Sequence, residues 1–243
     1  MVELKNVDVL YKESGVDALR DVNIRINDGE FVFIVGDSGA GKSTLLKLLT
    51  NEILPTKGRV FVNGYNLSKL KKKKIPKFRR SIGMVFQDFR LIPGMTVFEN
   101  VAFVLRVTDK SNRFIRKRVP YVLNLVKLAD RAKSHPSQLS GGERQRVGIA
   151  RAFATDPGLI IADEPTGNID PRLSYEIVEL LLDINKCGAT IIMVTHEHDL
   201  VRYFGGRIIN LKNGQVVFDD FIPGESPNSH DEMDDEYYDD EGV

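Results

Sequence analysis

The sequence predicts an α/β protein with a parallel sheet at its centre and two attached parts, one of antiparallel strands and one of helices. A continuous apolar run at residues 31–35 meets a glycine-rich loop and then a helical pattern at residues 43–50, which is the strand-loop-helix order of a parallel core. Alternating apolar residues at 2–9 and 59–62 predict antiparallel strands. Helical periodicity between residues 87 and 139 predicts a helical insertion.

The remaining elements follow in chain order. Short apolar runs predict further strands of the central sheet at residues 81–86, 159–162, 190–194 and 207–211. The dipeptides Asn63-Gly64 and Asn213-Gly214 predict tight turns, the second of them leading into a closing strand at 216–218. Within the insertion, the better helical segments are 97–107 and 119–128. We therefore expect one domain over residues 1–222, with a helical subdomain at about 88–145.

Composition limits the classes of protein to which the chain can belong. With 243 residues, of which 42% are hydrophobic, the chain can bury one substantial core. No segment approaches the roughly 20 apolar residues that span a bilayer, and the first residues lack the layout of a signal peptide, so we expect a cytoplasmic protein. The single cysteine, Cys187, excludes an internal disulfide and a cysteine metal cage.

The net charge of zero hides a segregation along the chain. Lys212 is the last lysine or arginine, while 11 of the 34 acidic residues lie at or after Asp219. The residues before Asp219 therefore carry a formal net charge of +11. A tail so acidic and so poor in apolar residues cannot offset its ordering entropy, so we expect residues 223–243 to be disordered. The tail serves either solubility or docking and autoinhibition.

A phosphate-binding loop follows the first buried strand. The segment GDSGAGKST matches G-x-x-x-x-G-K-[ST] and precedes a helix, as that motif requires. Its glycines let backbone N–H groups turn around phosphates. We expect Lys42 to reach the β- and γ-phosphates and Ser43 to bind Mg²⁺. The expected nucleotide contacts here are Gly36, Ser38, Gly39, Ala40, Gly41, Lys42, Ser43 and Thr44.

Two carboxylates end the buried strand at residues 159–162. Asp163 and Glu164 then emerge at the carboxyl edge of the sheet, where ligands bind in open α/β folds. Asp163 is suited to hold Mg²⁺ through its water shell, and Glu164 to polarise an attacking water as general base. Beside a phosphate loop, this pair predicts nucleotide hydrolysis.

A third motif carries a family resemblance. The segment Leu139-Ser140-Gly141-Gly142-Glu143 resembles the signature motif of ATP-binding cassette (ABC) ATPases. Ser140, Gly141 and Gly142 present a hydroxyl and N–H groups at the start of a helical segment, which suits a second phosphate site. Glu143 departs from the family's usual Gln at this position, and it serves either this site or the dipole of the helix.

Other positions match this family in order and spacing. Gln87 resembles the Q-loop glutamine, which senses Mg²⁺ and water and faces the membrane partner. His196 resembles the switch histidine, which contacts the γ-phosphate and orients Glu164. Residues 168–170 resemble the D-loop at the dimer interface, and Tyr11 resembles the aromatic residue that stacks on adenine, although a tyrosine at a strand end also serves packing.

The resemblance covers residues 1–220 and implies a RecA-like P-loop NTPase core with an antiparallel β lobe and a helical lobe. It implies ATP and Mg²⁺ as ligands and a head-to-tail homodimer in the ATP-bound state. In that dimer each ATP lies between Lys42 of one chain and Ser140 of the other. Hydrolysis then reopens the dimer and moves a membrane-bound partner.

Residues 86–93 and 96–102 are similar to the cell-division branch of the family. This implies an FtsX-like integral membrane partner, a peripheral place on the inner face of the cell membrane and control of peptidoglycan hydrolases at the septum. The competing hypothesis is a lipoprotein-release or macrolide-export ATPase. A soluble ABC ATPase acting on nucleic acid would need tandem cassettes or a coiled-coil insertion, and the sequence shows neither.

A basic run leaves three interpretations open. Eight lysines and arginines gather within residues 69–80, without aromatic residues interleaved for base stacking. The run is either a solvated face, a contact with anionic lipid beside the membrane partner, or a nucleic-acid contact. Nucleic acid is the least favoured of the three.

Overall fold

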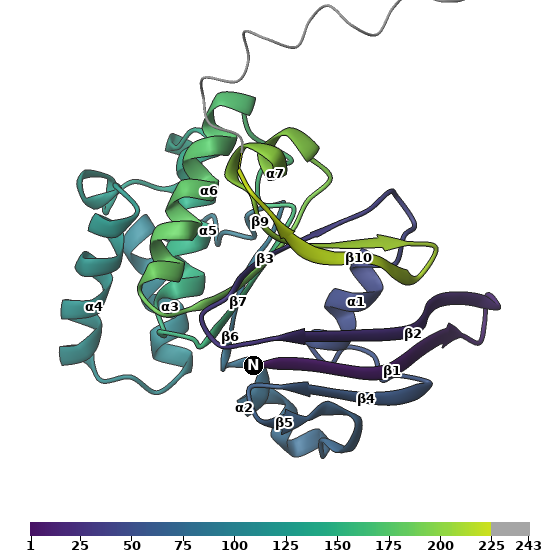
Figure 1. Cartoon of the computed structure of the whole chain (residues 1–243). Coiled ribbons are helices and arrows are strands. Elements are labelled where there is room, and N and C mark those ends of the chain that lie inside the picture. Colours follow the sequence, from purple (N-terminus) through teal and green to yellow (C-terminus); the bar gives the residue numbers. More distant parts are fainter. Residues whose placement is uncertain (225–243) are drawn as a thin grey trace, which may run out of the picture.

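The computed structural model describes residues 1–224 as two β-sheets and a set of helices (Figure 1). The acidic segment that we expect to be disordered lies, from residue 225 on, outside the described residues. The sheets and helices pack around two hydrophobic cores, one on each face of the larger sheet.

The larger sheet has six strands in the order β10-β9-β3-β8-β7-β6. All neighbours are parallel except β10, which pairs with β9 in an antiparallel hairpin. Side chains of β3 alternate between the two cores, because successive residues of a strand point to opposite faces. The strands are β3 (Phe31–Val35), β6 (Ile82–Val85), β7 (Leu159–Asp163), β8 (Thr190–Val194), β9 (Gly206–Lys212) and β10 (Gln215–Ile222).

The smaller sheet is antiparallel, in the order β2-β1-β4-β5. Helix α1 (Lys42–Leu49) lies between the two sheets, and its buried leucines share one core with both of them (Figure 1). The strands are β1 (Val2–Tyr11), β2 (Val16–Ile26), β4 (Lys57–Val62) and β5 (Tyr65–Asn66).

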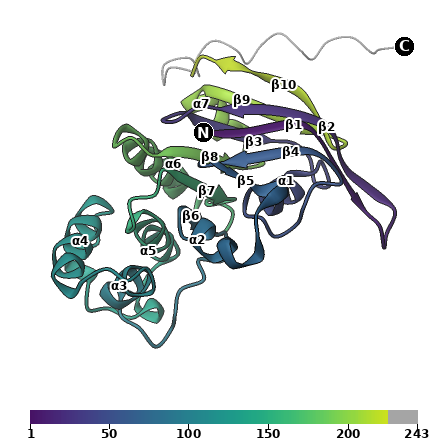
Figure 2. The same ribbon diagram turned by 90° about the horizontal axis from the view of Figure 1, so that it is seen from below.

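Helices cover the other face of the larger sheet, and Figure 2 shows α3, α4 and α5 set to one side of the strands. Capping side chains fix where these helices begin: Thr96 before α3, Ser111 before α4, Ser140 before α5 and Asp170 before α6. The helices are α2 (Ile75–Arg79), α3 (Val97–Val107), α4 (Asn112–Leu125), α5 (Gly141–Phe153), α6 (Pro171–Lys186) and α7 (His198–Phe204), and the short 3₁₀ helices are η1 (Leu67–Lys69), η2 (Lys72–Lys74), η3 (Ala129–Arg131) and η4 (Pro136–Gln138).

The architecture confirms the predicted α/β class, with parallel core, antiparallel sheet and helical part. Several features differ from the sequence prediction. Strands β2 and β5 and helices α2, α6 and α7 were not predicted, and α4 begins at Asn112 rather than at residue 119, with Pro120 inside it. Within residues 1–224, none of the helices combines the length and the apolar character that crossing a membrane requires.

Candidate active site

The loop that joins β3 to α1 has a backbone that requires glycine at two positions. Gly36 has a φ of 144° and Gly41 a φ of 109°, values that residues with a Cβ rarely adopt. A Cβ on Gly41 would lie 2.8 Å from the carbonyl oxygen of Ala18, and one on Gly36 would collide with that of Leu211. The loop is therefore held tightly against β2 and β9.

The N-terminus of α1 is suited to an anion. Its N-cap residue, Gly41, has no side chain to accept a hydrogen bond, and its first turn contains no acidic residue. The first N–H groups of a helix have no partner within the helix, and the helix dipole favours negative charge there. This end of α1 therefore fits a phosphate group.

Lys42 places a cation beside these N–H groups. Its side chain is buried, and Nζ donates hydrogen bonds to the carbonyl oxygens of Gly36 and of Asp37, the second at 3.1 Å. No carboxylate within residues 1–224 forms a salt bridge with it. A buried ammonium without a countercharge attracts an anion strongly, because little water screens it.

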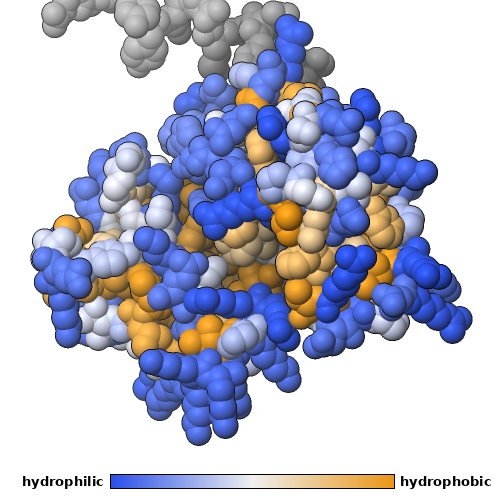
Figure 3. Space-filling model, turned by 180° about the vertical axis from the view of Figure 1, so that it is seen from behind, coloured by the Kyte–Doolittle hydropathy of each residue, from blue (hydrophilic) through white to orange (hydrophobic). Residues whose placement is uncertain are grey.

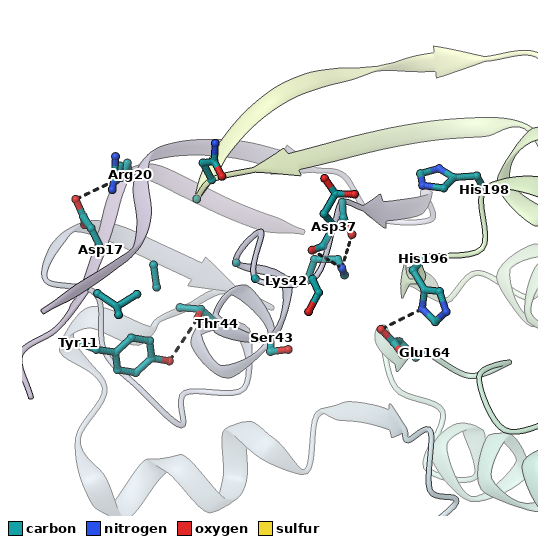
Figure 4. A pocket seen from close by; sticks show the side chains of 18 residues that line it. Tyr11, Asp17, Arg20, Asp37, Lys42, Ser43, Thr44, Glu164, His196 and His198 are labelled. Atoms are coloured by element: carbon teal, nitrogen blue, oxygen red, sulfur yellow. Dashed lines mark hydrogen bonds and ion pairs between the residues drawn. The ribbon is translucent and has the colours of Figure 1, made fainter. Parts of the chain in front are cut away.

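A cavity of about 970 Å³ opens over this loop (Figure 4). Its volume suits a nucleotide-sized ligand. Tyr11 lies at one end, where its hydroxyl is 3.4 Å from Oγ1 of Thr44. The predicted site residues that line the cavity are Tyr11, Gly36, Ser38, Gly39, Gly41, Lys42, Ser43, Thr44, Glu164 and His196.

Glu164 and His196 face Lys42 and Ser43 across the cavity (Figure 4). Glu164 follows the last residue of β7 and has a φ of 44°, an uncommon value for a residue with a side chain. Its N–H donates to the carbonyl oxygen of Val194 at 2.9 Å, which holds the strained backbone in place. Nδ1 of His196 lies 3.4 Å from Oε1 of Glu164, so the imidazole restricts where this carboxylate points.

Asp163 is the last residue of β7 and does not line the cavity itself. Burial raises the pKa of its carboxyl above the ordinary value, and the negative charge of Glu164 raises it further. Two adjacent carboxylates in a partly buried place destabilise each other when both are ionised. A hard cation with oxygen ligands would relieve that cost, so the donor set fits Mg²⁺, with the Ser43 hydroxyl as a further oxygen ligand.

Gln87 lies outside the cavity lining, on an exposed loop after β6. Its carbonyl oxygen accepts a hydrogen bond from Nδ2 of Asn168 at 2.9 Å, and its side chain packs against Gly167. The loop is therefore attached to the turn that follows Asp163 and Glu164. A movement of Gln87 would therefore shift the turn that follows Asp163 and Glu164.

The signature segment lies apart from the cavity of its own chain. Ser140 caps α5, with Oγ accepting from the N–H of Glu143 at 3.2 Å and Oε2 of Glu143 accepting from the N–H of Ser140 at 2.8 Å. The second of these hydrogen bonds keeps the pKa of Glu143 below its ordinary value. A Cβ on Gly141 would meet the carbonyl oxygen of Asn168 at 3.5 Å, so the segment packs beside residues 168–170. Seven of the predicted site residues do not line the cavity: Ala40, Gln87, Ser140, Gly141, Gly142, Glu143 and Asp163.

Several lining residues were missed by the sequence analysis. Four of them belong to β2, a strand that was not predicted, His198 is the first residue of α7, and the remaining three lie in loops or turns. Asp37 and Gly214 lie in segments that the motifs had already marked, so their places could have been found from the sequence. The missed residues are Val16, Asp17, Ala18, Arg20, Asp37, His198, Asn213 and Gly214.

Known families and sequences resemble this chain over most of its length. Residues 19–167 match the model of the family described as ABC transporter. The chain is 48% identical over 220 residues to the cell division ATP-binding protein FtsE of Bacillus subtilis, covering 90% of this chain and 96% of that protein. It is 47% identical over 220 residues to FtsE of Mycobacterium tuberculosis, with 90% and 96% covered.

A solved structure has the same fold. It is the dimeric, post-hydrolysis state of the ATP-binding cassette MJ0796 bound to ADP and Pi. The two chains are 42% identical and superimpose with a TM-score of 0.81, covering 93% of this chain and 100% of the other.

Proposed function

Because the chain belongs to the ABC transporter family and is an ATPase, we propose that it is the FtsE-type subunit of a cell-division complex, which couples ATP-driven dimerisation to an FtsX-like membrane protein. Through that partner it regulates peptidoglycan hydrolases at the septum, and no cargo crosses the membrane. The similarity to FtsE proteins along 90% of the chain supports this assignment.

The observation that carries the catalytic part is the position of Glu164 and His196 opposite Lys42 across one cavity. Lys42 and the N–H groups of α1 bind the β- and γ-phosphates of ATP, and Tyr11 stacks on the adenine. Glu164 takes a proton from the water that attacks the γ-phosphate, and His196 orients Glu164 and contacts that phosphate. Ser43, Asp163 and Gln87 would hold Mg²⁺, which neutralises charge on the phosphates.

A second chain completes each site. Ser140 and the two glycines after it present polar groups at the N-terminus of α5 but lie away from the cavity of their own chain. Two chains arranged head to tail place Ser140 of one against the ATP held by Lys42 of the other. The MJ0796 cassette is dimeric in its post-hydrolysis state, which supports a dimer of this chain. Binding of ATP closes the dimer, and hydrolysis reopens it.

The membrane partner binds in a groove beside the Gln87 loop. This docking groove, a cavity of about 430 Å³, lies between β6 and α3 and is lined by Phe86, Ile92, Phe103 and Val107 among others. Phe103 and Val107 are exposed, although both are large and apolar. An apolar groove of this kind suits a short amphipathic helix of a partner. The chain would then sit on the inner, cytoplasmic face of the membrane.

The experiment is to purify the protein from gently solubilised native membranes and to identify by mass spectrometry the integral membrane protein that accompanies it. Co-purification of an FtsX-like protein, lost on Phe103→Glu but retained on Phe114→Glu, supports the proposal; Phe114 is similarly exposed but lies on α4, outside the groove. A lipoprotein-release or macrolide-export permease would retain the catalytic roles and replace the cell-division function. Nucleic acid without any permease would contradict the membrane role.

A further inference from the structure

One face of the protein carries a dense group of cations that neither the active site nor the docking groove requires. Between Glu52 and Asp88 the sequence has ten lysines and arginines and no acidic residue. Eight of them lie on or beside η1, η2 and α2, and all eight are exposed. We call these eight the basic surface: Lys69, Lys71, Lys72, Lys73, Lys74, Lys77, Arg79 and Arg80.

The charges of the basic surface are not compensated. Within residues 1–224, no salt bridge includes any of its members. Three lysines follow one another in a single 3₁₀ turn at residues 72–74, where like charges repel. An anionic partner would relieve this repulsion.

The backbone under the basic surface is fixed. Phe78 of α2 is fully buried and packs edge-on against Tyr65, with ring centroids 5.4 Å apart. Arg79 donates through Nε to the carbonyl oxygen of Thr50 at 3.0 Å and through Nη2 to that of Asn51 at 3.1 Å, which ties α2 to the end of α1. The backbone that carries these cations is therefore already ordered, so binding does not require this segment to fold.

The basic surface is continuous with the docking groove, because Arg79 and Arg80 belong to both. Figure 3 shows hydrophilic side chains at the lower edge of the molecule, in the region of α2 and β5, with hydrophobic surface directly above them. A partner embedded in a membrane and seated in the groove would bring this edge toward the same membrane. Cations beside apolar groups are the composition that suits a surface of anionic lipid.

We propose that the basic surface binds the headgroups of anionic phospholipids on the membrane that holds the partner, an inference that rests on the proposed function. Lipid is favoured over single-stranded nucleic acid because no aromatic side chain between residues 53 and 87 is exposed for base stacking. Each lysine or arginine near an anionic membrane strengthens binding by about fivefold. The effect is confined to about 8 Å from the membrane at physiological salt.

The test is co-sedimentation of the purified full chain with vesicles of phosphatidylcholine, with and without phosphatidylglycerol. We expect binding only to the vesicles that contain phosphatidylglycerol, and its loss at high salt. The variant Lys72→Gln/Lys73→Gln/Lys74→Gln should bind roughly 100-fold more weakly. The control Arg113→Gln/Arg116→Gln/Lys117→Gln removes three exposed cations from α4 and should bind as the wild type does.

Three outcomes would overturn the inference. They are equal loss in both triple variants, absence of binding to anionic vesicles, and tighter binding of duplex DNA that depends on the same lysines. ATPase activity and co-purification with the membrane partner are measured on the same variants, so a failure here is distinguished from a failure of the proposed function.

Discussion

Nδ1 of His196 lies 3.4 Å from Oε1 of Glu164, on the side of the cavity opposite Lys42. The two residues come from loops that follow neighbouring strands, β7 and β8. Their proximity is therefore a consequence of strand order in the sheet. In the proposed mechanism, a carboxylate held in this way is pre-oriented toward the water that attacks a phosphate on the α1 side.

Replacing His196 should slow hydrolysis without preventing ATP binding. His196→Ala removes the group that orients Glu164, and we expect kcat to fall by about 100-fold while KM changes little. His198→Ala is the matched control, because His198 lines the same cavity but forms no hydrogen bond with Glu164. Steady-state ATPase assays measure both. Equal activity of the two variants would refute the role of His196.

Removing the charge of Asp163 should stabilise the protein when no nucleotide is present. Burial and the charge of Glu164 raise the pKa of Asp163. A carboxyl with a raised pKa favours the folded state while it is protonated, and this contribution is lost as pH rises through the folded-state pKa. Asp163→Asn should therefore raise Tm around pH 7 by about 2–4 °C and have less effect in acid.

Thermal unfolding without Mg²⁺ and ATP measures this difference. With Mg²⁺ and ATP added, the wild type should have the higher Tm of the two, because it has the Asp163 carboxylate for Mg²⁺ and the variant does not. A lower Tm for the variant without ligand would contradict the account.

Replacing Arg151 should weaken the loop that carries Gln87. The guanidinium of Arg151, on α5, donates to the carbonyl oxygens of Phe89, at 2.8 Å, and of Arg90. Phe89 and Arg90 both have positive φ values, 59° and 46°, so the loop relies on these hydrogen bonds. Arg151→Gln should lower the free energy of unfolding by about 2–3 kcal/mol.

Urea unfolding gives this value, and Arg116→Gln, an exposed change on α4, should stay within about 0.5 kcal/mol of the wild type. A similar decrease in the free energy of unfolding in both variants would show that the hydrogen bonds of Arg151 do not stabilise the loop.

Replacing Lys42 should remove most of the affinity for ATP. Lys42→Ala deletes the cation beside the first N–H groups of α1, and we expect Kd for ATP to rise by about 100-fold or more. Lys47→Ala is the control, because Lys47 is exposed in the last turn of the same helix. Isothermal calorimetry distinguishes the two. An unchanged Kd for Lys42→Ala would refute the assignment of residues 36–44 as a phosphate-binding loop.

Much of the fold could be predicted because most core strands are short and rich in apolar residues. Residues 190–194 were predicted as a strand and 97–107 as a helix, with the bounds that β8 and α3 have. Strand β2 was missed although Val22, Ile24 and Ile26 alternate with exposed residues. Before Val22 the alternation is irregular, and the pairing with β1 shifts register three times. Helix α4 was placed too late because its first turns carry few apolar residues.

The site was predicted where local motifs define it. The loop after β3 and the pair Asp163-Glu164 are each continuous in sequence, so their place at the sheet edge follows from the strand pattern. The contribution of β2 to the cavity could not be predicted, because it depends on how the smaller sheet packs over α1. The distance of Ser140 from the cavity likewise depends on the packing of the helical part.

The measurement that tests the central claim most directly is the mass of Glu164→Gln in solution with and without ATP, by light scattering after gel filtration. The account predicts a dimer that forms only with ATP, persists because hydrolysis is blocked, and is lost when Ser140→Arg is added to the same chain. A Glu164→Gln variant that still hydrolyses ATP at the wild-type rate and stays monomeric with ATP would contradict both the general base and the shared site.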